Sequence, residues 1–206
     1  MNYITDILYW ISTGLLVPVI VLLILLFCRA LLLIATFFGQ YLTVRKTEAL
    51  LKSEFDMLSQ DNIATLSDRL PKSQKSLVVN YVRLMMTHRD SEAHLQKLLS
   101  DFDLAAAADL ATSKTLAKMG PMLGLMGTLI PMGPALVGLS TGDIASMAYN
   151  MQVAFATTVV GLFSAAIGFI TGQFKSRWYR HDSVNLQFLA DLFGTLNIKH
   201  YAEKKK

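Results

Sequence analysis

The sequence predicts an all-α integral membrane protein whose three transmembrane helices continue as helices in the cytoplasm. Of its 206 residues, 53% are hydrophobic and only 17% are charged, which is too apolar for an ordinary soluble domain. The apolar residues are also gathered in uncharged runs, at residues 7–28, 119–142 and 144–174. A helix rises about 1.5 Å per residue, so each run is long enough to cross a hydrocarbon core of about 30 Å.

The first run, residues 7–28, is interpreted as a retained span rather than a cleaved signal peptide. The segment before it, MNYITD, holds an acidic residue and no Lys or Arg, and no small-x-small cleavage site follows the run. The single cysteine, Cys28, lies at the edge of this span. One cysteine cannot form an internal disulfide, and it offers no metal-binding or redox spacing.

The apolar character continues beyond Arg29 to Leu42, so the first helix is expected to cover 36 positions from residue 7. This length exceeds one bilayer crossing, and the helix is therefore expected to tilt or to project into the cytoplasm. Arg29 is then expected to extend its charged end to the inner interface. An ion pair buried in the membrane is the functional alternative for this arginine.

Two amphipathic helices are predicted in the region between residues 45 and 118. The segment TEALLKSEFDMLSQ, which begins at Thr47, and a longer segment at residues 76–119 both place apolar residues three and four positions apart. A break is expected between them, around Pro71. The longer segment contains no Gly or Pro and leads into the second apolar run, so one continuous helix is expected there.

The second and third runs are joined by the sequence Ser-Thr-Gly-Asp at residues 140–143, which suits a tight turn. Asp143 is expected to cap the third span, and a functional acid is the alternative for this residue. After the third span, Trp178 and Tyr179 are typical of the membrane interface, and the helix continues towards a basic C-terminal tail.

Basic residues set the expected orientation. Residues 45–118 hold eleven Lys or Arg and residues 175–206 hold seven, whereas segments 1–6 and 140–143 hold none. The positive-inside rule then predicts a multi-pass protein of the inner (cytoplasmic) membrane with its N-terminus outside. The net charge of +4 follows from this topology and the anionic inner leaflet, and it does not indicate nucleic-acid binding. The chain thus divides into an outer segment and first span (1–44), a cytoplasmic helical region (45–118), a transmembrane hairpin (119–174) and a cytoplasmic helix with a basic tail (175–206).

Small residues recur along one face of each of the last two spans. Because small residues let the backbones of membrane helices approach closely, both faces are expected to be packing faces. Pro131 and Pro134 are expected to bend the second span within an assembly. The small residues of the third span are Ala154, Thr158, Gly161, Ala165 and Gly168, at intervals of four and three, and those of the second span are Gly120, Gly124, Gly127 and Thr128.

Three threonines, Thr128, Thr157 and Thr158, lie near the middle of these spans. Each hydroxyl could simply donate to a carbonyl of its own helix, which is common. The alternative is a polar ring, because the two spans of one hairpin carry Thr at similar depth. Such hydroxyls could hold water or accept a hydrogen bond from a carboxylic acid.

The second and third spans contain no Asp, Glu, His, Lys or Arg, so this chain has no titratable relay of its own. Any ion-driven chemistry would need a carboxylate from a partner. The sequence shows no Gly-rich phosphate loop, no HExxH motif and no Ser/His/Asp constellation, and its four histidines are isolated among polar residues. We therefore expect no enzyme activity, no cofactor and no metal site.

The hairpin also resembles a known family. GPMLGLMGTLIPM at residues 120–132 and AFATTVVGLFSAAIGF at residues 154–169 are similar to the two signature spans of the MotA/TolQ/ExbB proton channel family. The resemblance extends from Lys114 to Lys175. The layout of three spans with an outside N-terminus is similar to the TolQ/ExbB branch rather than to the four-span MotA branch.

The resemblance implies a homo-pentamer around a central pore, which holds the single spans of two partner chains similar to ExbD, TolR or MotB. Each partner supplies a membrane Asp that carries the proton past pore threonines, and the ring is implied to rotate about the partner dimer. Carried over by motif, the threonines of this ion path are Thr128 and Thr158, with Thr157 as their neighbour. Pro121 matches the proline that opens the second span, and it joins the helix-packing residues Gly124, Gly127, Ala154, Gly161, Ala165 and Gly168.

Two features depart from the family pattern. TolQ/ExbB chains usually carry Glu five residues before the third-span threonine, and here Val153 stands at that position before Thr158, next to Gln152. Pro131 and Pro134 replace residues that are usually Gly, Ala or bulky aliphatic. Both departures bear on which ion is used and how strongly it is coupled.

Two functions are therefore weighed. The favoured one is a pore-ring subunit of an ion-driven membrane motor, with the proton as the expected ion, which couples flow through a partner's aspartate to rotation or force across the cell envelope. The other is a non-conducting membrane scaffold or assembly protein that uses the same small residues only for packing.

Overall fold

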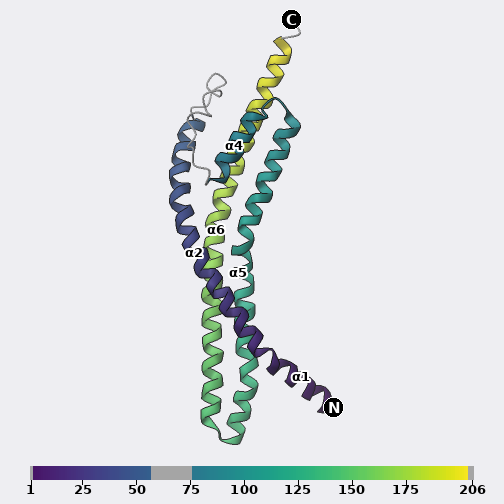
Figure 1. Ribbon diagram of the computed structural model, residues 1–206, viewed down its shortest axis with the longest axis vertical. Coiled ribbons are helices and arrows are strands. Elements are labelled where there is room, and N and C mark those ends of the chain that lie inside the picture. Colours follow the sequence, from purple (N-terminus) through teal and green to yellow (C-terminus); the bar gives the residue numbers. More distant parts are fainter. Residues whose placement is uncertain (1, 57–75, 204–206) are drawn as a thin grey trace. The chain divides into compact units, whose positions relative to one another are not determined.

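The computed structural model describes residues 2–56 and 76–203 (Figure 1). Within these ranges, three helical stretches are long and apolar enough to cross a membrane: Ile7–Leu42, Glu92–Thr141 and Ile144–Thr195. The predicted all-α fold with three helices able to span a membrane is thus confirmed. The helices are α1 (Asn2–Gly14), α2 (Leu16–Asp56), α4 (Leu77–Thr87), α5 (Glu92–Thr141) and α6 (Ile144–Glu203).

The first predicted helix is interrupted at Leu15, which separates α1 from α2. The predicted stretch of 36 residues from residue 7 is nevertheless the first candidate span, Ile7–Leu42, and only its helical bonding is interrupted at Leu15. Pro18 explains the interruption, because it has no N–H to donate to the carbonyl of Gly14 four residues earlier. Helical bonding resumes where the Val19 N–H donates to the Leu15 carbonyl at 3.1 Å. Beyond this break α2 runs to Asp56, in agreement with the predicted extension past the first span.

A turn at residues 88–91 divides the long helix that the sequence predicts at residues 76–119. The prediction of one continuous helix is wrong at this turn. It holds from Glu92 onwards, where α5 continues without interruption into the second apolar run. Within the turn, the Ser91 N–H donates to the His88 carbonyl at 3.2 Å.

The chain divides into two compact units, and α2, α5 and α6 contribute a segment to each. The first unit comprises Met1–Thr36 and Ala111–Gln173, and the second comprises Phe37–Leu110 and Phe174–Lys206. The break predicted around Pro71 lies outside the described residues.

The second unit has an apolar core between α4, α5 and α6. This core accounts for the turn at residues 88–91, because α4 can bury its apolar side only by folding back onto the other two helices. The buried residues of the core are Val78, Val79, Val82, Met85, Leu95, Phe102, Leu186, Leu189, Ala190 and Phe193.

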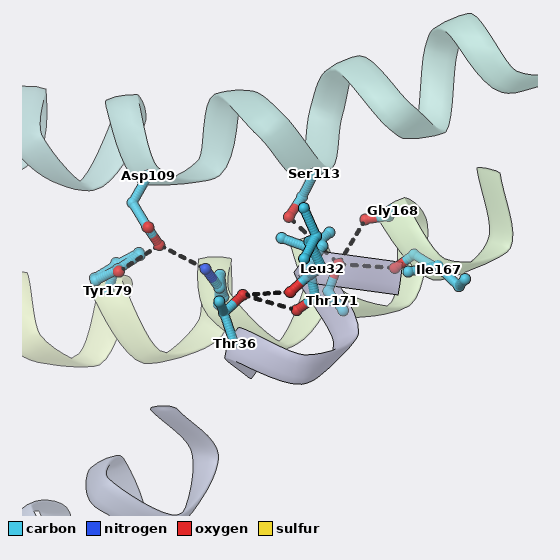
Figure 2. A network of polar contacts seen from close by, with 10 residues as sticks. Leu32, Thr36, Asp109, Ser113, Ile167, Gly168, Thr171 and Tyr179 are labelled. Carbon is cyan, nitrogen blue, oxygen red and sulfur yellow. Dashed lines mark hydrogen bonds and ion pairs between the residues drawn. The ribbon is translucent and has the colours of Figure 1, made fainter. Parts of the chain in front are cut away.

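A buried ion pair links α5 and α6 in the second unit (Figure 2). The Nζ of Lys175 lies 2.8 Å from Oδ2 of Asp109, which also accepts a hydrogen bond of 2.7 Å from the Tyr179 hydroxyl. The two charged side chains are unequally buried, since 3% of Lys175 is exposed against 34% of Asp109. Water can therefore solvate the carboxylate, whereas the ammonium depends on its protein partners.

This inequality predicts different responses to removal of each charge. Asp109→Asn is expected to destabilise the protein by about 3 kcal/mol or more, because it leaves a buried ammonium without a counter-charge. Lys175→Met is expected to cost less than about half of that, because the remaining carboxylate keeps its contact with water and with Tyr179. Melting temperatures of the detergent-purified variants measure both effects. Equal losses would show that burial does not set the sensitivity of this pair.

An aromatic cluster joins α2 and α6 in the second unit. The rings of Phe37 and Trp178 are stacked, with centroids 5.4 Å apart and an interplanar angle of 8°. Tyr41 lies 5.8 Å from Trp178, and Phe174 lies 6.0 Å from Phe37, both measured between ring centroids. These ring contacts hold α2 against α6, and the interfacial position of Trp178 stays a prediction.

In the first unit, α2 packs against α5 and α6 through its buried residues Val19, Leu23, Ala30 and Leu33. The neighbouring Arg29 is exposed. Among residues 2–56 and 76–203, the structure shows no ion pair that involves Arg29.

The turn between α5 and α6 is built by two residues. Gly142 has a φ of +77°, a left-handed conformation that glycine adopts without strain at the end of a helix. Asp143 then caps α6, because its Oδ1 accepts a hydrogen bond of 3.0 Å from the Ser146 N–H. The predicted capping role of Asp143 is confirmed.

Candidate functional site

In the first unit, α5 and α6 pack backbone to backbone at glycines that the sequence singled out. A Cβ added to Gly120 would lie 2.5 Å from the Gly161 carbonyl oxygen, and one added to Gly161 would lie 2.9 Å from the Gly124 Cα. A Cβ added to Gly168 would lie 2.7 Å from the Ser113 carbonyl oxygen. Side chains do not fit at such distances, so this contact requires glycine.

Six of the seven residues assigned to helix packing are buried. Pro121 is the seventh, and its side chain is exposed on α5. The buried residues are Gly124 and Gly127 of α5 and Ala154, Gly161, Ala165 and Gly168 of α6.

A buried pair of hydroxyls extends the α5–α6 contact, and sequence reasoning missed it (Figure 2). The side-chain oxygens of Ser113 and Thr171 lie 3.3 Å apart. Thr171 also donates its proton to the Ile167 carbonyl at 2.7 Å, so Ser113 is the donor between the two hydroxyls. The small-residue spacing of the third span did not reveal this pair, because its alternation of four and three continues from Gly168 to Gly172, one residue beyond Thr171.

One side of the α5–α6 hairpin is covered by α2. The residues that pack with α2 recur at intervals of seven, which is about two helical turns, so they mark one line along each helix. They are Leu116, Leu123 and Ile130 on α5, and Val160 and Ile167 on α6.

Thr128 and Thr158 lie on the opposite side of the hairpin from α2. Each stands two residues before an α2-packing residue, Ile130 or Val160, and this offset is about 200° around an α-helix. Both threonines are half-buried. Thr158 borders α5, because a Cβ added to Gly124 would lie 3.6 Å from the Thr158 Cα.

Thr157 occupies a different place, inside the α5–α6 contact. Its residue surface is 8% exposed, and a Cβ added to Gly127 would lie 2.6 Å from the Thr157 Oγ1. Thr157 is adjacent to Thr158 in sequence, but the structure does not bring the three threonines to one surface.

All three hydroxyls donate to carbonyls of their own helices. The Thr128 Oγ1 lies 2.7 Å from the Leu125 carbonyl oxygen, and the Thr158 Oγ1 lies 3.1 Å from that of Ala154. Thr157 donates to the same Ala154 oxygen at 2.9 Å. A hydroxyl has one proton, so the oxygens of Thr128 and Thr158 can only accept a further hydrogen bond. They suit a water molecule, a protonated carboxyl group or a cation.

The surface around these two threonines is otherwise apolar. On α5 the neighbouring apolar residues are Leu125 and Met132, five residues before and two residues after Ile130. On α6 they are Phe155 and Leu162, at the same offsets from Val160. Both offsets are about half a turn, so these side chains also face away from α2. These four residues are between 40% and 64% exposed in this chain. We call this surface the uncovered face: Thr128, Thr158, Leu125, Met132, Phe155 and Leu162.

The uncovered face offers hydrogen-bond acceptors but no ionisable group. None of its six residues carries a charge, and residues 119–142 and 144–174 contain no Asp, Glu, His, Lys or Arg. In the part of the chain that the structure describes, no three His, Cys, Asp or Glu side chains are grouped in a way that could hold a metal ion. Proton movement along this face therefore requires water or a carboxyl group from another molecule.

Comparison with known proteins identifies one family. The sequence model of the MotA/TolQ/ExbB proton channel family matches residues 72–187, which is more than half of the 206 residues. The matched region includes α4 and the whole uncovered face. No curated protein sequence matches the chain.

Proposed function

The chain belongs to the MotA/TolQ/ExbB proton channel family, and from this membership we propose that it is a pore-ring subunit of a proton-driven membrane motor. In this proposal five copies form a ring around the single spans of two partner chains similar to ExbD, TolR or MotB. Protons cross through the membrane Asp of each partner, and their flow drives rotation or force across the cell envelope. A membrane potential supplies about 2.3 kcal/mol per charge for each 100 mV, so each proton can do modest work.

The main structural support for this proposal is the uncovered face. A ring with α2 outside would turn this face towards the lumen, where Thr128 and Thr158 meet the partner spans. Because both hydroxyl protons are committed to backbone carbonyls, the threonine oxygens can accept from a protonated carboxyl group but cannot donate to an ionised one. A hydrogen bond to the neutral form favours that form, so the partner's acid would stay protonated beside the threonines and ionise where water reaches it.

The proposed topology follows from the distribution of basic residues. The N-terminus and the turn at residues 140–143 lie outside the inner membrane, and regions 45–118 and 175–206 lie in the cytoplasm. In this arrangement the α5–α6 glycine contact keeps each hairpin rigid, and Thr157 contributes to that contact as the neighbour of Thr158.

Native mass spectrometry tests the proposal directly. The detergent-purified chain is expected to have the mass of five subunits, and co-expression with a single-span partner that has a membrane Asp is expected to add two partner chains. A control partner with this Asp replaced by Asn should still bind, because the apolar span supplies most of the contact. A monomer or dimer that ignores the partner would contradict the motor and favour a membrane scaffold.

A further inference from the structure

Three prolines remove backbone hydrogen bonds from α5. A proline has no N–H, so the carbonyl four residues earlier loses its α-helical donor. The prolines inside α5 are Pro121, Pro131 and Pro134, and the carbonyls concerned are those of Ala117, Gly127 and Ile130.

Among these prolines, Pro121 lies on the side of α5 that faces away from α2. It is exposed, whereas Pro131 is fully buried and Pro134 is half-buried. Pro121 stands two residues before the α2-packing residue Leu123, which is the offset that places Thr128 opposite α2. Pro121 and Thr128 are seven residues apart, about two turns, so they lie on one line of the helix.

The carbonyl oxygen of Ala117 therefore lacks its α-helical donor, and it does so on the side of α5 that carries the uncovered face. A helical carbonyl points along the axis towards the residue four positions later, which here is the exposed Pro121. Ala117 itself is half-buried, and its backbone N would lie 2.7 Å from a Cβ added to Gly168 of α6. This carbonyl resembles the oxygens of Thr128 and Thr158 in that it can accept a hydrogen bond and has no proton to give.

We infer that the Ala117 carbonyl oxygen is a third acceptor of the proton path, at the end of the uncovered face remote from the α5–α6 turn. It binds the water molecule or protonated carboxyl group that carries a proton along this face. The inference rests on the proposed function and extends the path from two side chains to a backbone atom. From the turn onwards, the acceptors follow in the order Thr128, Thr158 and Ala117.

The spacing of these acceptors indicates how a proton would travel. Thr158 borders Gly124, so its height along α5 is that of Gly124. Gly124 is four residues from Thr128 and seven from Ala117. Along the helix axis, Thr158 is therefore about 6 Å from Thr128 and about 10 Å from Ala117. Neither step is within hydrogen-bond reach. Bridging water or movement of the partner's acid along the face must therefore connect the acceptors.

Pro121→Ala tests the inference, because alanine returns an N–H to the Ala117 carbonyl and closes this acceptor. We expect proton flux to fall about tenfold, as for the loss of one hydrogen bond to a charged or proton-carrying group. Flux is measured with a pH-sensitive dye in liposomes that contain the chain purified with its single-span partner, under a potassium diffusion potential. The matched control is Pro134→Ala, which closes the Ile130 carbonyl on the side covered by α2 and should keep flux within about twofold of wild type.

A second replacement separates the carbonyl from the shape of the proline ring. Lactic acid at position 121, the ester analogue of alanine, has neither the ring nor an N–H, so it leaves the Ala117 carbonyl open. Wild-type flux with lactic acid and reduced flux with alanine would support the inference, and the same ester at position 134 controls for the weaker ester carbonyl. Equal losses with both replacements would assign the effect to the ring and overturn the inference.

The experiment also separates this inference from the proposed function. If wild-type liposomes conduct and Pro121→Ala conducts equally well, the third acceptor is refuted while the motor stands. If wild-type liposomes with the partner carry no proton flux, both the proposed function and the acceptor are refuted.

Discussion

Gly161→Ala is expected to destabilise the protein by about 2–3 kcal/mol, the upper part of the range for overpacked interiors. The added Cβ would lie 2.6 Å from the Gly120 carbonyl oxygen and 2.9 Å from the Gly124 Cα. Both are backbone atoms of α5, which cannot rotate away as a side chain can. The two helices would have to separate, and close packing is the main source of attraction between helices in lipid.

Gly194→Ala in the same helix is the matched control. No atom would lie within 4 Å of the added Cβ at Gly194. Alanine is a better helix former than glycine by roughly 0.5–1 kcal/mol, so this variant should keep or raise the melting temperature. Fluorescence of Trp10 and Trp178 during heating in detergent measures both variants. Equal melting temperatures would contradict the backbone contact between α5 and α6.

Much of this contact could be predicted from the sequence. Glycine and alanine at intervals of four and three have few physical uses in an apolar span other than close packing, so the positions of Gly124, Gly161 and Gly168 pointed to a helix contact. The side of the hairpin that α2 covers could not be predicted in the same way. It depends on residues such as Leu123 and Ile130, whose side chains do not differ from the many other apolar side chains of the spans.

Within the candidate site, the sequence also could not predict which way two adjacent threonines face. Thr157 and Thr158 are neighbours in sequence, yet an α-helix turns by about 100° between them. Thr157 therefore lies against Gly127 while Thr158 lies on the uncovered face, and the sequence alone could not say which threonine takes which place. The ion pair between Asp109 and Lys175 could not be predicted from the sequence either. The two residues are 66 positions apart, and no spacing rule connects them.

The two helix breaks differ in how far the sequence could reveal them. Pro18 removes a specific backbone bond, so the interruption at Leu15 could have been predicted from the sequence. The turn at residues 88–91 contains neither Gly nor Pro. The turn forms because α4 folds back and buries Val79, Val82 and the rest of the core of the second unit. The stabilisation comes from contacts between residues far apart in sequence, which no local sequence pattern reveals.

Replacing both Thr128 and Thr158 by Val is expected to lower partner-dependent proton flux by about 100-fold, since two acceptors are lost and each hydrogen bond to a proton-carrying group is worth about tenfold. Valine keeps the shape of threonine and removes the hydroxyl. The fold should be little affected, because each hydroxyl donates to a carbonyl of its own helix, at Leu125 and Ala154. The ring mass in native mass spectrometry and the proton flux in liposomes measure the two consequences separately.

Thr36→Val provides a control that removes the same kind of bond elsewhere. The Thr36 Oγ1 donates to the Leu33 carbonyl at 3.0 Å, but Thr36 is an exposed residue of α2, outside the uncovered face. Its loss should leave flux unchanged, so a selective effect of the double variant would arise from where Thr128 and Thr158 lie. Full flux in the double variant, in a ring of unchanged mass, would show that the threonine oxygens do not serve the path. The proton would then have to be carried by the partner's acid and water alone, and the uncovered face would act only as a packing surface.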